Sequence, residues 1–172
     1  LPENLKGLIL GGGYPELNAR ELEANVSMRE DIHRALNDGM PCLAECGGFM
    51  YLHDEMEAMD GNSYHMAGVI SGRAYRTQRL NRFGYVTLTQ KKEVLGMNDM
   101  GGIPAHEFHY FDSENCGDDF DAKKPASHRK WNCIHGTDTM MAGFPHLYFY
   151  GNPKVPEAFL RKCSQYGRQD AR

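Results

Sequence analysis

The chain has 172 residues, of which 41% are hydrophobic and 24% charged, and its formal net charge is −4. These values are typical of one globular domain, and the acidic balance argues against a nucleic-acid or anionic-membrane partner. No hydrophobic run approaches the roughly 18 residues that span a bilayer, and no signal peptide is apparent. We therefore expect a cytoplasmic protein that binds neither nucleic acid nor membrane.

The cysteines and the first residues indicate the redox state of the thiols and the extent of the domain. The five cysteines are odd in number and scattered, which is typical of reduced thiols and not of a disulfide framework. The sequence begins at Leu1 without an initiator methionine and reaches a strand-like segment at once. We interpret residues 1–172 as one domain, truncated at its N-terminus and cut from a longer protein.

The first motif is a hydrophobic strand, residues 8–10, followed by three glycines at 11–13. Glycines let the backbone approach a ligand closely, so the N–H groups of Gly12 and Gly13 could stabilise an oxyanion. The loop lacks the spacing and the lysine of a phosphate-binding loop. On this segment alone, a simple tight turn is an equally good interpretation.

Residues 17–37 show helical periodicity, and Ser27 with Glu30 would form a capping box that divides them into two helices. A second strand, residues 41–45, then leads directly into Cys46, two glycines and a short helical pattern. Strand, sharp turn and helix form the geometry of a nucleophile elbow. The helix N-terminus would favour the thiolate, so Cys46 is the candidate nucleophile, with the Gly47 N–H as a further oxyanion donor.

Two successive strand–loop–helix units predict a parallel α/β sheet with both loops at one edge. A late hydrophobic segment, residues 139–150, predicts another strand of the core, and His146 lies in it. There His146 could activate Cys46 for acyl transfer from an amide through a thioester. A structural histidine is the alternative interpretation.

The middle of the chain contains further predicted strands, at residues 66–70, 73–75 and 83–89, and an exposed loop at 112–130. Four arginines lie among these strands and could clamp carboxylates or form a solvated face: Arg73, Arg76, Arg79 and Arg82.

A second polar cluster contains His106, Glu107 and His109. On a strand the two histidines would face opposite sides, and the HExxH pattern is absent. We therefore expect no metal site. A polar wall of the substrate site is the better functional interpretation.

Four stretches in order carry a family resemblance: LILGGGYPEL (8–17), AECGGFMYL (44–52), HEFHY (106–110) and HLYF (146–149) before Asn152-Pro153. Together they closely resemble the C-terminal class I-type glutamine amidotransferase domain of the cobyrinate a,c-diamide synthase family. The resemblance covers nearly the whole chain. It implies a flavodoxin-like three-layer α/β sandwich with a mainly parallel sheet, here lacking its first strand and helix.

The resemblance also implies a function. Cys46 would attack the glutamine side-chain amide and release ammonia, with His146 as the catalytic histidine. The parent enzyme would be an ATP-dependent ligase of cobalamin biosynthesis that amidates the a and c carboxylates of cobyrinate. Its partners would be glutamine, the tetrapyrrole acceptor and an N-terminal domain that binds ATP and Mg, with a homodimer as a further option. This chain itself would bind no cofactor.

The sequence departs from the amidotransferase pattern at Tyr148, where triad enzymes have a glutamate two residues after the histidine. Glu45 or Glu107 could take that role, and His106, Glu107, His109 and Tyr148 could instead line the tetrapyrrole. Without a phosphate loop, the chain cannot perform the ligation alone. The alternatives are the same chemistry on nickel sirohydrochlorin or cobyric acid, or a catalytically weak domain that binds substrate or mediates subunit contacts.

Overall fold

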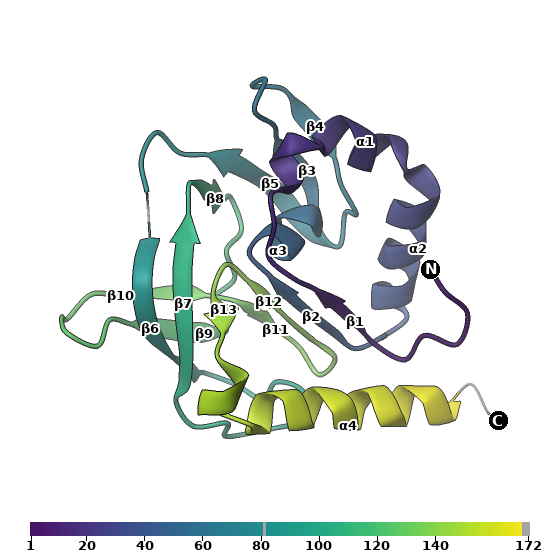
Figure 1. Ribbon diagram of the computed structural model, residues 1–172. Coiled ribbons are helices and arrows are strands. Elements are labelled where there is room, and N and C mark those ends of the chain that lie inside the picture. Colours follow the sequence, from purple (N-terminus) through teal and green to yellow (C-terminus); the bar gives the residue numbers. More distant parts are fainter. Residues whose placement is uncertain (81, 170–172) are drawn as a thin grey trace.

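The computed structural model describes residues 1–80 and 82–169, which form a mixed α/β fold with several sheets (Figure 1). No helix in this part of the chain is long and hydrophobic enough to cross a membrane. The helices are short except for the last one; they are α1 (Ala19–Ala24), α2 (Val26–Asn37), α3 (Gly47–Tyr51) and α4 (Lys154–Gln169), with 3-10 turns η1 (Pro15–Leu17) and η2 (Phe149–Gly151).

A small sheet carries the two motifs of the N-terminal half. Its strands lie in the order β1 (Leu8–Leu10), β2 (Cys42–Glu45), β12 (Met140–Gly143) and β11 (His135–Gly136). The first three are parallel and β11 is antiparallel. The glycine loop after β1 and the elbow after β2 therefore meet at one edge of the sheet, as predicted.

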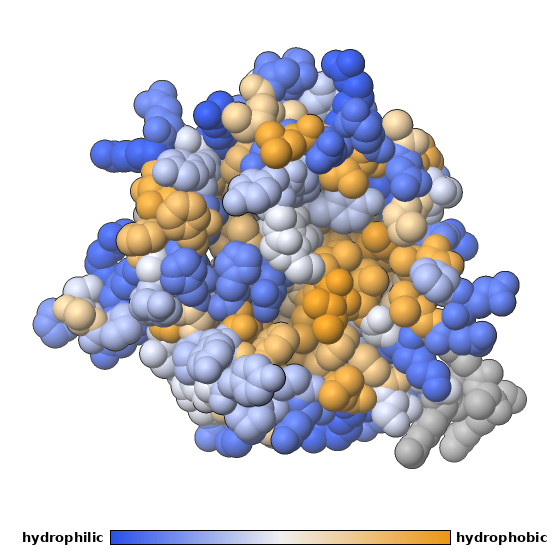
Figure 2. Space-filling view, in the orientation of Figure 1, coloured by the Kyte–Doolittle hydropathy of each residue, from blue (hydrophilic) through white to orange (hydrophobic). Residues whose placement is uncertain are grey.

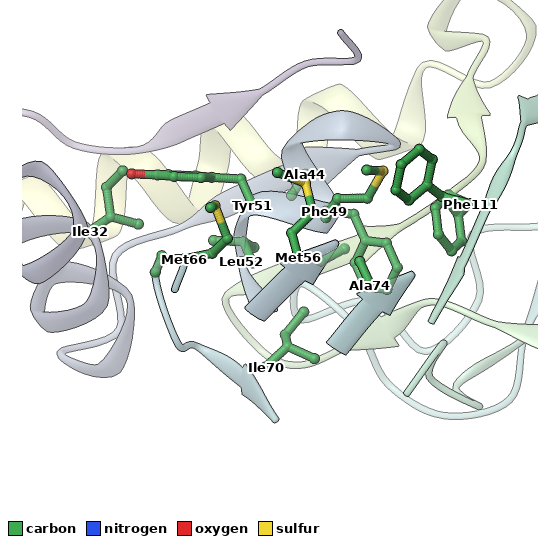
Figure 3. Packing of buried hydrophobic residues seen from close by; sticks show 14 of the residues in the cluster. Ile32, Ala44, Phe49, Tyr51, Leu52, Met56, Met66, Ile70, Ala74 and Phe111 are labelled. Carbon is green, nitrogen blue, oxygen red and sulfur yellow. The ribbon is translucent and has the colours of Figure 1, made fainter. Parts of the chain in front are cut away.

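The central strand β2 is covered on both faces, which explains why its first three residues are hydrophobic and buried. Leu43 and Met141 pack into one core together with α4, whereas Ala44 and Ala142 pack into the other. The second core includes Phe49, Leu52 and Met56 behind the elbow (Figure 3). The layers hold the carboxyl ends of the three parallel strands at fixed positions.

Two further sheets contain all the other strands of the described residues. A five-stranded antiparallel sheet has the order β10 (Lys130–Cys133), β9 (Phe120–Lys123), β6 (Arg82–Gln90), β7 (Ile103–His109) and β13 (His146–Leu147). A four-stranded sheet has the order β4 (Ser63–His65), β3 (His53–Glu57), β5 (Ile70–Arg76) and β8 (Phe111–Ser113). Parallel pairing joins β1, β2 and β12 in the first sheet and also β3 with β5, while the other strand pairs are antiparallel.

Several local predictions are corrected by the structure. The helical segment does divide in two, but at Asn25, whose side chain accepts the Met28 N–H at 3.4 Å. Asn is a strong N-cap two residues before the predicted Ser27 cap. Of residues 66–70 only Ile70 is in a strand. Residues 112–130 are no simple exposed loop, because they contain β9 with Phe120 fully buried.

Residues 139–150 do not form one strand. The segment leaves the parallel sheet at Gly143, and β13 resumes at His146 in the antiparallel sheet, where His146 lies opposite His106. Pro145 between them has no N–H to donate to a ladder, which favours a break at this point.

Candidate active site

Cys46 occupies a strained backbone position between β2 and α3. Its φ of 48° and ψ of −105° are rarely adopted by a residue with a side chain. Its N–H donates to the Gly143 carbonyl at 2.9 Å, which ties the elbow to the end of β12. Only 9% of Cys46 is exposed. The elbow geometry predicted from the sequence is therefore present.

The two glycines after Cys46 allow the first glycine-rich loop to lie directly against the elbow. A Cβ atom on Gly47 would lie 2.8 Å from the Gly13 carbonyl oxygen, and one on Gly48 would overlap the Leu10 carbonyl. The Gly48 N–H donates to the Gly11 carbonyl at 3.1 Å. Within residues 1–80 and 82–169, the N–H groups of Gly12, Gly13 and Gly47 have no hydrogen-bond acceptor, so they are available to a ligand.

His146 reaches the elbow from the antiparallel sheet. Its ring lies against the glycine loop, because a Cβ atom on Gly12 would overlap the His146 Cε1 atom. The Nδ1 atom lies 3.6 Å from Glu45 Oε2, and Glu45 Oε1 accepts the Leu147 N–H at 3.1 Å. Glu45 thus contacts both the ring and the backbone of β13.

The electrostatic surroundings of His146 favour its protonated form. The adjacent Cys46 thiol, followed by the Glu45 carboxylate, raises the pKa of His146 to about 10, although partial burial opposes this shift. The three side chains form one interacting group.

Cys46 and His146 open into a cavity of about 730 Å³. The sequence predicted several of its lining residues, namely Gly12, Gly13, Cys46, His106, His109 and His146. It did not predict Tyr14, Glu16, Met50, Phe108, Tyr110 or Phe111 as cavity residues. Glu16 lies directly after the glycine loop, a position that could have suggested it.

Glu107 does not reach His146 but forms a buried network with His109. Glu107 Oε2 lies 2.8 Å from His109 Nε2, and its Oε1 accepts the Trp131 indole N–H at 3.1 Å. His109 Nδ1 lies 2.6 Å from the Phe111 carbonyl oxygen, and the ring stacks on Phe144 with centroids 4.1 Å apart. Both His109 ring nitrogens have partners, and the ring packs against Phe144 in the loop between Gly143 and His146.

His106 and Tyr148 lie on the outer side of this region. His106 faces away from the buried Glu107 and His109, as strand alternation predicted, and contacts Tyr85 with ring centroids 5.4 Å apart. Tyr148 is 59% exposed and lines a neighbouring hollow with His106, His146 and Tyr85. The structure thus places the two predicted wall residues beside His146.

Two of the four candidate arginines form ion pairs with acidic residues. Arg73 pairs with Glu114, and Arg82 with Asp112, each at 3.6 Å, so these two arginines have structural partners. In the part of the chain that the structure describes, no group of three or more His, Cys, Asp or Glu residues is arranged to hold a metal.

A strained cysteine elbow above parallel strands, a histidine beside it and free loop N–H groups define an α/β protein equipped for cysteine-dependent acyl transfer. Comparison with known proteins identifies the family. Residues 1–153 match the CobB/CobQ-like glutamine amidotransferase domain, so the chain belongs to that family.

Several relatives are named cobyrinate a,c-diamide synthase. The chain is 36% identical to that of Caldanaerobacter subterraneus over 98% of its own length, and 34% identical to one from Dehalococcoides mccartyi over 94%. It is 39% identical to that of Fusobacterium nucleatum over 87%. The chain spans only 38%, 36% and 33% of the length of these relatives, respectively.

One solved structure has a similar fold. It is that of a candidate GMP synthase component from Thermoplasma acidophilum, and it aligns with a TM-score of 0.54 and 17% identity. The alignment covers 99% of this chain and 78% of the other. At this identity, the similarity is evidence for the fold alone.

Proposed function

We propose that this domain hydrolyses glutamine at Cys46 and supplies the ammonia to an amidation carried out by a longer protein. One observation carries the proposal. Cys46, His146 and the unbonded N–H groups of the glycine loop converge on one cavity. Membership of a glutamine amidotransferase family supports the choice of substrate.

The proposed reaction begins when the Cys46 thiolate attacks the amide carbon of glutamine. The oxyanion that forms would accept hydrogen bonds from the N–H groups of Gly47 and of Gly12 or Gly13. Protonated His146 gives its proton to the leaving nitrogen, so that ammonia departs and a thioester remains. His146 then takes a proton from water as the water oxygen attacks the thioester carbon; glutamate is released, and the Cys46 thiolate leaves with His146 protonated again.

Glu45 is the proposed third member of the catalytic group. It lies at ion-pair distance from His146 Nδ1, whereas Glu107 is engaged by His109 and Trp131. Tyr148, at the position where triad enzymes have glutamate, is exposed. Glu45 would hold the imidazolium and orient it toward Cys46.

The identity of the acceptor comes from the relatives. We infer that the ammonia amidates the a and c carboxylates of cobyrinate in cobalamin biosynthesis, because the relatives carry that name. ATP and Mg would bind outside this domain, in the part of the relatives that the chain does not match. His106, His109 and Tyr148 remain proposed as a wall toward the tetrapyrrole. Glu107 is removed from that wall, because its side chain is fully buried and engaged by His109 and Trp131.

The architectural details of the sequence prediction also remain proposals. We propose that residues 1–172 form one amidotransferase domain with flavodoxin-like layering, in a cytoplasmic enzyme. A homodimer could use the hydrophobic surface over edge strand β1, where Ile9 is 59% exposed (Figure 2). Sedimentation velocity would test it.

The main test is to replace Cys46 by Ser and to measure ammonia release from glutamine. We expect release to fall to background in Cys46→Ser and to be unchanged in Cys116→Ser, a matched control at a half-buried thiol. In the longer parent enzyme, Cys46→Ser should still amidate cobyrinate when free ammonia is supplied. Loss of both activities would contradict the assigned role.

A second candidate is a catalytically weak domain that binds substrate or mediates subunit contacts. The exposed Tyr148 at the usual glutamate position favours it. Failure of a glutamine-analogue electrophile to modify Cys46, combined with glutamine binding at the cavity, would favour this candidate over hydrolysis. The same amidation of nickel sirohydrochlorin or cobyric acid would be distinguished by acceptor assays on the parent enzyme.

A further inference from the structure

The cavity around Cys46 is bordered by a carboxylate that the reaction above does not use. Glu16 lies in η1, directly after the glycine loop, and lines the cavity with Cys46 and His146. Its place is set by Pro15, which packs on the elbow, since a Cβ atom on Gly47 would lie 2.9 Å from Pro15 Cδ. Figure 1 shows the chain after β1 crossing above α3. Glu16 is therefore anchored next to the nucleophile.

A cation lies within electrostatic reach of Glu16 on a different element. Arg76 ends β5 and is paired in register with Phe111, a residue of the cavity wall. The next residue, Thr77, donates its N–H to the carbonyl of Tyr110 at 2.7 Å, and Tyr110 also lines the cavity. The backbone of Arg76 is thereby held beside the cavity wall, and its side chain is exposed.

The two charges influence each other without forming an ion pair. Burial raises the pKa of Glu16 above its usual value, while a backbone hydrogen bond and, to a smaller extent, the Arg76 charge oppose this shift. Among the described residues no salt bridge joins them or links the Arg76 guanidinium to another carboxylate. A partly desolvated carboxylate and a free guanidinium form a pair of complementary sites for a ligand with both charges.

We propose that Glu16 and Arg76 bind the zwitterionic head of glutamine, with Glu16 accepting from the α-ammonium and Arg76 donating to the α-carboxylate. This inference rests on the proposed function, because it assumes that the side-chain amide lies at Cys46. Glutamine carries its amide and its charged head at opposite ends of a short side chain, which suits a cavity with the nucleophile inside and the charges at the border. The pair would select free glutamine over amides that lack either charge.

The test compares substrates that lack one charge. Ammonia release is measured for glutamine, for glutaramate, which lacks the α-ammonium, and for glutamine α-amide, which lacks the α-carboxylate charge. Glu16→Gln should reduce the preference for glutamine over glutaramate by about tenfold, and Arg76→Gln the preference over the α-amide by a similar factor, since each loses one charge-assisted hydrogen bond. Glu21→Gln and Arg34→Gln, both exposed on α1 and α2, are controls that should retain both preferences.

Binding to the Cys46→Ser chain, measured by calorimetry with the same three compounds, separates this inference from the proposed function. If each variant weakens binding of all three compounds equally, the charged-head site is wrong while hydrolysis at Cys46 stands. If the chain with Cys46 intact releases no ammonia, but Glu16→Gln still removes the binding preference for glutamine over glutaramate, the proposed hydrolysis is wrong while the charged-head site stands. Absence of glutamine binding would overturn both.

Discussion

A thiol reacts with an electrophile in proportion to its thiolate fraction and its accessibility. Burial raises the pKa of Cys42 to about 12 and also raises those of Cys116, Cys133 and Cys163. These four thiols therefore stay protonated at neutral pH. Cys46 instead borders the cavity with an imidazolium beside it.

We accordingly predict that iodoacetamide at pH 7 modifies Cys46 at least about tenfold faster than the other four thiols. Peptide mass spectrometry over a time course measures each rate. His146→Gln should slow the modification of Cys46 and leave that of Cys163 unchanged. Equal modification of Cys46 and Cys163 in the unmodified sequence would contradict the prediction.

The raised pKa of His146 makes a second prediction, on pH dependence. The leaving nitrogen needs the His146 proton, which is retained up to a pKa of about 10, so hydrolysis should decline only as the pH rises through that value. The Glu45 carboxylate favours the protonated His146 ring, so Glu45→Gln should lower the pKa of His146. The alkaline limb of the pH–rate profile should then move to lower pH. Profiles of kcat/KM against pH measure the limb, with Glu21→Gln as control. An unmoved limb would exclude Glu45 as the partner of His146.

At the scale of elements, the glycine loop and β13 can lie this close together because Gly12 has no side chain. A methyl group on Gly12 would overlap the His146 ring, whereas a Cβ atom on Gly11 meets nothing within 4 Å. The ring is half-exposed and can move away, so the overlap should disturb the catalytic geometry more than the fold.

We predict that Gly12→Ala lowers kcat by at least about tenfold, because a displaced general acid loses its contribution to the rate. The free energy of unfolding should change by less than about 1 kcal/mol. Gly11→Ala, in the same loop, should leave both quantities near those of the unchanged chain. Equal kcat values for the two variants would show that His146 does not need the space above Gly12.

At the scale of the whole molecule, the active site lies where two sheets meet. Cys46 belongs to the parallel sheet and His146 to the antiparallel one. The buried network of Glu107, His109 and Trp131 joins the antiparallel sheet to Phe144 in the loop that connects them. The relative position of Cys46 and His146 therefore depends on interactions outside the cavity.

Removing the buried carboxylate should destabilise the protein. Glu107→Ala leaves the Trp131 N–H and His109 Nε2 without their acceptor in the interior, so we predict that the free energy of unfolding falls by about 3–5 kcal/mol. Urea titration measures it. Glu107→Gln keeps the side-chain volume and supplies an amide oxygen as acceptor, so its free energy of unfolding should fall by less. A Glu107→Ala midpoint equal to that of the unchanged chain would refute this role.

Much of the site was predictable because its signals are local. The elbow at Cys46 and the glycine loop are each specified by a few adjacent residues, and alternation along β7 correctly placed His106 and His109 on opposite faces. The partner of His146 was not predictable, since Glu45 and Glu107 were equal candidates. Glu16 and Arg76 lie sixty residues apart and show no shared pattern.

By itself, the sequence determined that a cysteine ends a buried strand, that glycines permit close backbone approach there, and that the chain resembles glutamine amidotransferases. The tertiary structure decided that His146 comes from a second sheet, that Glu45 contacts it, and that Glu107 is engaged by His109. The reason is physical. Backbone geometry and strand periodicity depend on neighbouring residues, whereas the pairing of charges depends on which sheets pack together.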